Sequence, residues 1–193
     1  MLTFRNYNIA DWFSFYRIAI VPILLLILWL EEREVFTWML CISYITDAID
    51  GYLARKLQIN SARGAQLDSF GDQLTFLVSL IGLWVFENQF IRDQLFLILL
   101  AFTPYLIQML LAFRKYGKAT AFHTYLAKIS AIIQAAFVLY TLFFGVIHGF
   151  FYLMIVVGIL ETAEEITLIF LYKKWEKDVK GVYWAWREIR TGK

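Results

Sequence analysis

The chain has 193 residues, of which 61% are hydrophobic and 19% aromatic, and its mean hydropathy is +0.62. The apolar residues come in long blocks and not in one-sided stripes, which is typical of a protein that crosses a membrane several times and not of a soluble domain. The formal net charge of only +2 gives no reason to expect a nucleic-acid partner.

Six apolar windows have the length of about 20 residues that one membrane crossing needs. They cover roughly residues 13–30, 36–55, 65–87, 93–113, 122–146 and 149–172. Backbone groups in lipid must pair internally, and the blocks lack the alternation of barrel strands, so we expect helices. The sequence therefore predicts an all-α integral membrane protein with six transmembrane helices, in a single membrane domain over residues 1–193. Residues 1–12 mix aromatic and charged side chains and predict an interfacial segment before the first span.

The distribution of positive charge predicts the orientation in the membrane. If the N-terminus is cytoplasmic, only Arg33 and Arg92 of the 18 Lys and Arg residues fall on the far side. This bias places both chain ends, and the turn between the second and third spans, on the cytoplasmic side. We therefore expect a multi-pass protein of the cytoplasmic (inner) membrane.

Arg17 lies about one turn inside the first span and allows two interpretations. Its side chain could snorkel outward to the head groups, which is the simpler interpretation for a long cationic side chain near a helix end. Alternatively, it could face an acidic cluster formed by the next two spans.

That cluster consists of four aspartates where the second and third spans adjoin: Asp47, Asp50, Asp68 and Asp72. A carboxylate at the centre of a spanning helix costs roughly 2.5–3.5 kcal/mol, so four of them need compensation. The first two are three residues apart and the last two four apart, so each pair lines one face of its helix, and a short turn lets the faces converge. Oxygen ligands without His or Cys suit Mg²⁺ or Mn²⁺ better than zinc, and two such ions could share the site.

Further positive charges follow the fourth span and enter the fifth. They are Arg114, Lys115, Lys118 and Lys128. The first three are typical of a positive-inside anchor, but Lys128 lies deep enough to need a partner. It could form an ion pair with a glutamate of the sixth span, or it could line a polar substrate pocket. The candidate glutamates are Glu161, Glu164 and Glu165.

The chain after Lys173 combines several lysines and arginines with Tyr183, Trp184 and Trp186. A basic segment rich in tryptophan just after a span should lie on anionic head groups. We therefore predict a basic amphipathic C-terminal segment at the membrane surface.

The residues around the aspartates form the spaced pattern Asp47-x2-Asp50-Gly51-x2-Ala54-Arg55-x8-Gly64-x3-Asp68-x3-Asp72. This pattern resembles, position for position, the signature of the CDP-alcohol phosphatidyltransferase family. Eight fixed residues at fixed spacing over residues 47–72 leave little room for a chance match. Six spans with cytoplasmic ends also look like the architecture of that family.

The resemblance implies an enzyme of phospholipid biosynthesis. It would transfer a phosphatidyl group, or another substituted phosphoryl group, from a CDP-linked lipid such as CDP-diacylglycerol to a small polar alcohol, releasing CMP. The resemblance implies that Asp47, Asp50 and Asp68 ligate Mg²⁺ or Mn²⁺, and that Asp72 is the catalytic base and a further ligand. It also implies a homodimer surrounded by membrane lipids. The implied CDP site consists of the first three aspartates with Gly51, Ala54, Arg55 and Gly64.

The acceptor is indicated less closely. The four cations at 114, 115, 118 and 128 would suit a phosphorylated alcohol such as glycerol 3-phosphate or inositol phosphate, because an extra phosphate needs cationic partners. Bacterial phosphatidylglycerophosphate synthases commonly have a lysine after the fourth aspartate, whereas Gln73 stands there in this chain. Glycerol 3-phosphate is the favoured acceptor. The sixth-span glutamates could equally form an ion pair with the amine of serine or ethanolamine.

A function of another class is a cation transporter or channel that uses the aspartate cluster as its pathway. That class predicts charged positions throughout the membrane depth and often internal repeats. The aspartates are confined to one side and the sequence shows no repeat, so the enzyme is the favoured hypothesis.

Overall fold

The structure is a computed structural model that describes residues 9–57 and 62–191. Within these ranges, the side chains at positions 9–14, 50–57, 62–69 and 189 lie outside the description. The described residues form helices and no strand, apart from one isolated bridge between Ala121 and Lys177. The prediction of an all-α fold is therefore confirmed for this part of the chain.

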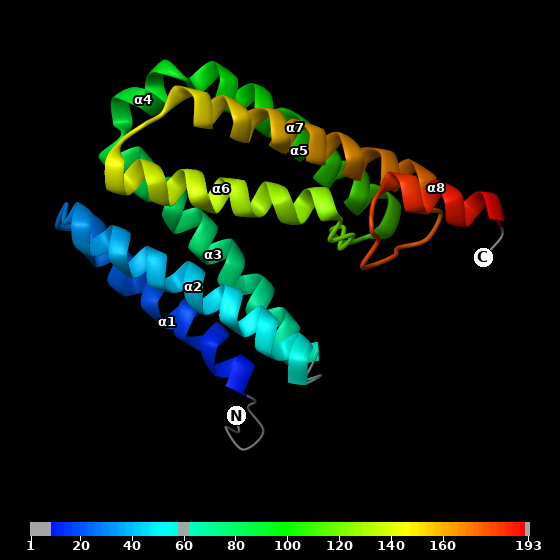
Figure 1. Cartoon of the computed structure of the whole chain (residues 1–193), viewed down its shortest axis with the longest axis horizontal. Helices are drawn as coiled ribbons and strands as arrows, with labels where there is room; N and C mark the ends of the chain where they lie inside the picture. Colours follow the sequence, from blue (N-terminus) through cyan, green and yellow to red (C-terminus); the bar gives the residue numbers. More distant parts are fainter. Residues whose placement is uncertain (1–8, 58–61, 192–193) are drawn as a thin grey trace. The chain divides into compact units, whose positions relative to one another are not determined.

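In the described part of the chain, six long helices coincide with the six apolar windows, and two short helices follow the third and the sixth (Figure 1). In chain order, the helices are α1 (Ile9–Trp29), α2 (Arg33–Leu57), α3 (Ala62–Phe86), α4 (Asn88–Asp93), α5 (Leu95–Tyr116), α6 (Tyr125–Phe144), α7 (His148–Leu171) and α8 (Val182–Thr191).

Two helices among the described residues, α5 and α6, are long and apolar enough to cross a membrane by length and composition. Among the residues whose side chains are described, α1 and α3 contribute the shorter apolar stretches Phe15–Trp29 and Phe70–Phe86. The helices α2 and α7 each contain three carboxylates within their length. Six crossings, the cytoplasmic orientation and a single membrane domain thus stay predictions.

The chain divides into two compact units, each built from helices that pack on one another. The first comprises Met1–Gln89 with Val138–Gly145, and in it α1 packs against both α2 and α3. The second comprises Phe90–Phe137 with Val146–Lys193, and in it α7 packs against α5 and α8. The predicted aspartate site belongs to the first unit, and the cations after the fourth span belong to the second.

In the core of the first unit, α2 and α3 pack closely together at Phe36 and Gly82. Phe36 is fully buried, and a Cβ atom at Gly82 would lie 2.5 Å from its Cε1 atom. The Phe36 ring also packs against Phe86, with ring centroids 5.7 Å apart, so it has little room to move. Only glycine at position 82 therefore allows the two helices this approach.

Arg33 ties the beginning of α2 to the end of α6 within the same unit. Its Nη2 donates to Glu87 Oε1 at 2.6 Å and to the carbonyl of Thr141 at 2.9 Å, while its Nε donates to the carbonyl of Leu142 at 2.8 Å. These carbonyls belong to the last turn of α6, where the carbonyl of Thr141 also accepts a hydrogen bond from Gly145 N at 2.9 Å. One guanidinium thus satisfies a helix end and a carboxylate together.

In the second unit, the segment before α6 is fixed to the segment before α8. Val179 N donates to Phe122 O at 2.7 Å, and Asp178 N donates to Ala121 O at 3.1 Å. Both segments flank a small core in which Leu168 and Ala185 are completely buried. The position of α8 is therefore set by the backbone that leads into it.

We expect Gly82→Ala to lower the stability of the protein by about 1–2 kcal/mol. Overpacking a well-packed core costs about 1–3 kcal/mol, and the higher helix propensity of alanine returns up to about 1 kcal/mol of this. Thermal unfolding in detergent would show a lower Tm. A matched control is Gly158→Ala in α7, where nothing lies within 4 Å of the added Cβ and Tm should be unchanged or higher. An equal effect of both substitutions would contradict the steric explanation.

Candidate active site

Three helices of the first unit bring charged side chains to one point. Arg17 of α1 is 1% exposed, and its Nη1 forms ion pairs with Asp47 Oδ1 of α2 and with Asp72 Oδ1 of α3. The two carboxylates are 41% and 51% exposed, so they lie at the rim of the position that the guanidinium occupies. Carboxylates from two neighbouring helices thus converge on one cation.

The snorkelling interpretation of Arg17 is wrong. A guanidinium placed inside a helix bundle is costly unless it is paired and hydrogen-bonded. Asp47 and Asp72 supply that pairing, so the side chain is buried against the carboxylates of α2 and α3. The alternative interpretation, in which Arg17 faces the acidic cluster, is confirmed.

Gly71 provides the space for the Arg17 side chain on α3. A Cβ atom at this position would lie 3.6 Å from Arg17 Cζ and 3.7 Å from Nε. These are ordinary contact distances, so a methyl group fits there. A longer side chain would occupy the volume of the guanidinium itself.

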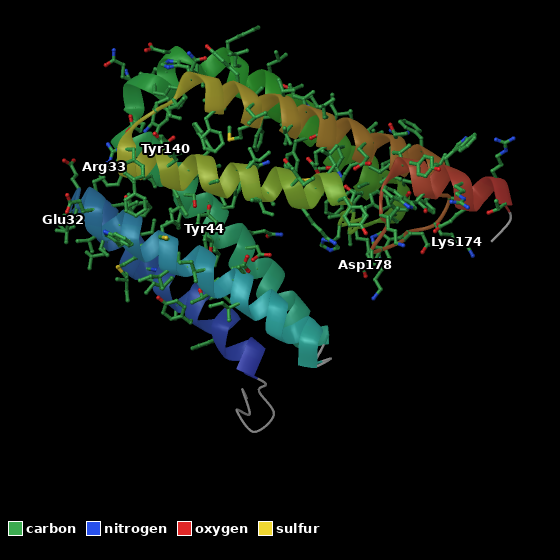
Figure 2. All side chains as sticks on the ribbon, in the orientation of Figure 1. Glu32, Arg33, Tyr44, Tyr140, Lys174 and Asp178 are labelled. Atoms are coloured by element: carbon green, nitrogen blue, oxygen red, sulfur yellow. The ribbon has the colours of Figure 1, made fainter. Side chains whose placement is uncertain are left out.

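A hydrogen bond beside the site holds α2 against α3. Tyr44 lies one turn before Asp47, and its hydroxyl is 2.9 Å from Ser79 Oγ (Figure 2). Ser79 Oγ itself donates to the carbonyl of Thr75 at 2.7 Å, which leaves Tyr44 as the donor to Ser79. The spacing of the two helices near the carboxylates is therefore fixed by a buried polar contact.

The other signature residues lie in the same two helices, but their side chains are outside the described residues. The helix α2 runs without a break through positions 47 to 57, and α3 runs without a break through positions 62 to 72. The predicted roles in metal and CDP binding that fall outside the description are those of Asp50, Gly51, Ala54, Arg55, Gly64 and Asp68.

The donor set around Arg17 suits a hard cation. Asp47 and Asp72 offer carboxylate oxygens, and the position between them already accommodates positive charge. The residues with described side chains include no group of three or more His, Cys, Asp or Glu that could hold a metal ion. A metal site would therefore need Asp50 or Asp68 in addition, and metal ligation stays a prediction.

The four cations predicted to bind the acceptor all belong to the second unit. Lys115 Nζ donates to the carbonyl of Ile169 near the end of α7, and Lys118 Nζ lies 3.5 Å from the centroid of the Trp175 ring. Lys128 Nζ lies 5.7 Å from the centroid of the Tyr125 ring, and Arg114 is exposed. Their role as an acceptor site stays a prediction.

The glutamates of α7 take partners that the sequence interpretation did not consider. Glu165 Oε2 accepts hydrogen bonds from Gln108 Nε2 at 2.6 Å and from Thr120 Oγ1 at 2.7 Å. Glu164 accepts from Thr124 Oγ1 at 2.6 Å and from the backbone N–H of Val182 at 3.2 Å. Hydroxyl, amide and backbone donors thus satisfy the two carboxylates that were considered as partners of a lysine.

No ion pair joins Lys128 to a glutamate among the residues whose side chains are described. The residues that the sequence interpretation missed are Thr120, Thr124 and Gln108. The two threonines lie in the irregular segment between α5 and α6, where helical periodicity gives no guide to side-chain direction.

Comparison with known proteins agrees with the signature. The family model described as CDP-alcohol phosphatidyltransferase matches residues 7–163. A CDP-diacylglycerol–glycerol-3-phosphate 3-phosphatidyltransferase of Rickettsia typhi is 26% identical over 130 residues, which cover 66% of this chain and 71% of that protein. The protein of the same name from Rickettsia prowazekii is also 26% identical, over 66% of this chain and 70% of that protein.

A plant relative is more similar over a shorter stretch. The Arabidopsis thaliana CDP-diacylglycerol–glycerol-3-phosphate 3-phosphatidyltransferase 1 is 38% identical over 68 residues, which cover 34% of this chain and 23% of that protein. No solved structure matches this chain significantly. Because the family model covers most of the chain, including the aspartate signature, this protein belongs to the CDP-alcohol phosphatidyltransferase family and is an enzyme of that family.

Proposed function

We propose that this enzyme transfers the phosphatidyl group of CDP-diacylglycerol to glycerol 3-phosphate and releases CMP, as a step of phospholipid biosynthesis. The observation that carries the proposal is the convergence of Asp47 and Asp72, from two helices of the family signature, on the buried Arg17. The relatives in Rickettsia and Arabidopsis, which are named for CDP-diacylglycerol and glycerol 3-phosphate, support this donor and this acceptor.

The reaction requires charge neutralisation at a diphosphate and a base for the acceptor hydroxyl. Mg²⁺ or Mn²⁺, in one or two ions bound by Asp47, Asp50, Asp68 and Asp72, would neutralise the diphosphate and favour departure of CMP. Arg55, with Gly51, Ala54 and Gly64, would hold the nucleotide. These assignments follow the signature positions on α2 and α3.

Asp72 is the proposed base. Its side chain is half exposed, so an acceptor can reach it. As the hydroxyl oxygen of glycerol 3-phosphate bonds to the phosphatidyl phosphorus, its proton passes to the Asp72 carboxylate. The bond from that phosphorus to the bridging oxygen of the diphosphate breaks, and CMP leaves with this oxygen. The ion pair with Arg17 positions the carboxylate for this transfer.

The environment of the α7 glutamates favours a phosphorylated acceptor over an amine. Glu164 and Glu165 already accept hydrogen bonds from side chains and backbone of this chain. Neither carboxylate therefore needs the ammonium group of an acceptor as a partner. The cations Arg114, Lys115 and Lys118 are exposed near the end of α5 and are suited to a phosphate.

The membrane arrangement completes the proposal. The lipid donor is amphiphilic, so its acyl chains remain in the bilayer while its CDP group reaches the carboxylates. We place the enzyme in the cytoplasmic membrane, with six spans and the active site facing the cytoplasm, and as a homodimer. Two membrane-capable helices and the bias of positive charge support this placement.

An acceptor panel tests the reaction. With purified protein in nanodiscs, CDP-diacylglycerol and Mg²⁺ or Mn²⁺, we expect glycerol 3-phosphate to release CMP at least tenfold faster than serine, ethanolamine or inositol phosphate. Because the diphosphate charge needs a divalent ion, EDTA should abolish the release. CMP measured by chromatography is the readout. Folded protein that releases no CMP with any acceptor would contradict the proposal, and faster release with serine would reassign the acceptor.

Variants of two aspartates serve as the matched control for this assay. Loss of a general base typically slows a reaction by about 10²–10⁴-fold, so Asp72→Asn should fall in that range. Asp93→Asn makes the same chemical change at an exposed position at the end of α4 and should keep full activity. Equal activity of the two variants would exclude Asp72 as the base.

The position of Arg17 predicts how the protein responds to metal. Arg17→Gln leaves two carboxylates without their cation, so stability in EDTA should fall by about 1.5–3 kcal/mol, the range for hydrogen bonds to charged groups. Mg²⁺ or Mn²⁺ should then raise Tm more in this variant than in the unchanged protein, because a divalent ion can replace the missing positive charge. The metal-induced rise in Tm of Arg17→Lys should lie between those of Arg17→Gln and the unchanged protein.

Differential scanning fluorimetry of the three proteins, with EDTA and with metal, measures this response. Equal metal-induced shifts in the unchanged protein and in Arg17→Gln would show that metal binds away from the carboxylates that Arg17 contacts.

A further inference from the structure

The outward face of α8 combines aromatic rings with guanidinium groups. Tyr183, Trp186, Arg187 and Arg190 follow the spacing of one helical face and are all exposed. Arg190 Cζ lies 5.1 Å from the centroid of the Trp186 ring, so cation and ring present a shared surface. On the opposite side, Ala185 is completely buried. The helix is therefore sharply two-sided.

This face is held in a fixed direction by the second unit. The backbone N–H of Val182, the first residue of α8, donates to Glu164 Oε1, and a Cβ atom at Gly181 would lie 2.9 Å from the same oxygen. The Trp184 ring packs against Tyr125 at the beginning of α6, with centroids 5.6 Å apart. The hydrogen bond to Glu164, the close packing at Gly181 and the contact between Trp184 and Tyr125 thus fix the position and direction of α8.

The fixed position of α8 lies where a membrane-capable helix ends. Ala112, in the last turns of α5, belongs to the same buried cluster as Ala185 of α8. Since α5 has 22 residues and rises about 1.5 Å per residue, it is long enough to span the roughly 30 Å hydrocarbon layer once. Its end, and with it α8, therefore lies at the depth of the head groups.

The charge around α8 is complementary to an anionic surface. Residues 173–191 contain six lysines and arginines but only three carboxylates. Lys174 and Asp178 mark the segment between α7 and α8 (Figure 2). Tryptophan and tyrosine prefer the interface between lipid and water, and arginine pairs with phosphate. The α8 face of a second copy would bring the same excess of positive charge, so two such faces would repel each other.

We propose that the outward face of α8 binds the anionic head groups of the bilayer, and that Glu164 joins this lipid-binding helix to the segment between α5 and α6. Through one carboxylate oxygen Glu164 holds Val182, and through the other it holds Thr124. Two backbone hydrogen bonds, from Val179 N to Phe122 O and from Tyr125 N to Lys180 O, join the same two segments. Binding of anionic lipid at α8 therefore steadies residues 118–124.

Hydrogen exchange of the full-length protein in nanodiscs tests the proposal without any assay of catalysis. Discs of phosphatidylcholine alone are compared with discs containing about one-third phosphatidylglycerol. We expect the amides of α8, and those of residues 118–124, to exchange at least threefold more slowly in the anionic discs. Raising the salt to about 0.5 M should remove the difference, because exposed charges are then screened.

Two variants separate the outcomes. Arg187→Gln combined with Arg190→Gln should remove the dependence on lipid charge, whereas Glu188→Gln on the same helix should keep or increase it. Equal exchange of α8 in neutral and anionic discs of the unchanged protein would overturn the proposal. If the double variant unfolds α8, the salt response of the unchanged protein decides alone. Slower exchange in α8 without any change at 118–124 would overturn the coupling through Glu164.

Discussion

The guanidinium of Arg17 is almost completely buried between carboxylates of two other helices, and the arrangement of α1, α2 and α3 depends on this contact. A charge in such a position is tolerated only when opposite charges are close to it. Conversely, Asp47 and Asp72 would repel each other if no cation lay between them. The guanidinium and the two carboxylates therefore stabilise one another, and the same contact holds the three helices together and positions the carboxylates of the site.

In the proposed metal site, this arrangement would hold the carboxylates in place before a divalent ion binds. Asp47 and Asp72 are about half exposed, so an incoming ion can approach them from the solvent side while Arg17 remains behind them. Tyr44 and Ser79 hold the same two helices at a fixed spacing. The carboxylates are thus preorganised, which is what fast phosphoryl transfer requires of groups that do little covalent chemistry.

Much of the fold was predictable because it follows from hydropathy and spacing. The apolar blocks predicted the positions of the six long helices in the described ranges, and the intervals within the aspartate signature predicted the convergence that Asp47 and Asp72 show. The amphipathic C-terminal segment also followed from its composition, since Tyr183 and Trp186 are exposed on α8 as expected. Each of these features repeats along the chain or depends on a local period.

Other features could not be predicted because they depend on contacts between distant residues. No sequence periodicity predicts the direction of a single cation such as Arg17, because its partners lie 30 and 55 residues away in the sequence. Glu164 and Glu165 suggested a lysine partner by depth alone, whereas Thr120 and Thr124 reach them from an irregular segment. Hydrogen bonding by threonine depends on the path of that segment, which composition does not encode.

A diffraction experiment on crystals grown with Mn²⁺ and CDP-diacylglycerol, recorded at the manganese absorption edge, tests the role of these carboxylates most directly. The expected result is an anomalous peak within about 2.0–2.4 Å of carboxylate oxygens of both Asp47 and Asp72, the range of metal–oxygen bonds for such ions. A manganese peak elsewhere in the protein, with Asp47 and Asp72 turned away from the nucleotide, would contradict a metal-assisted active site at this position.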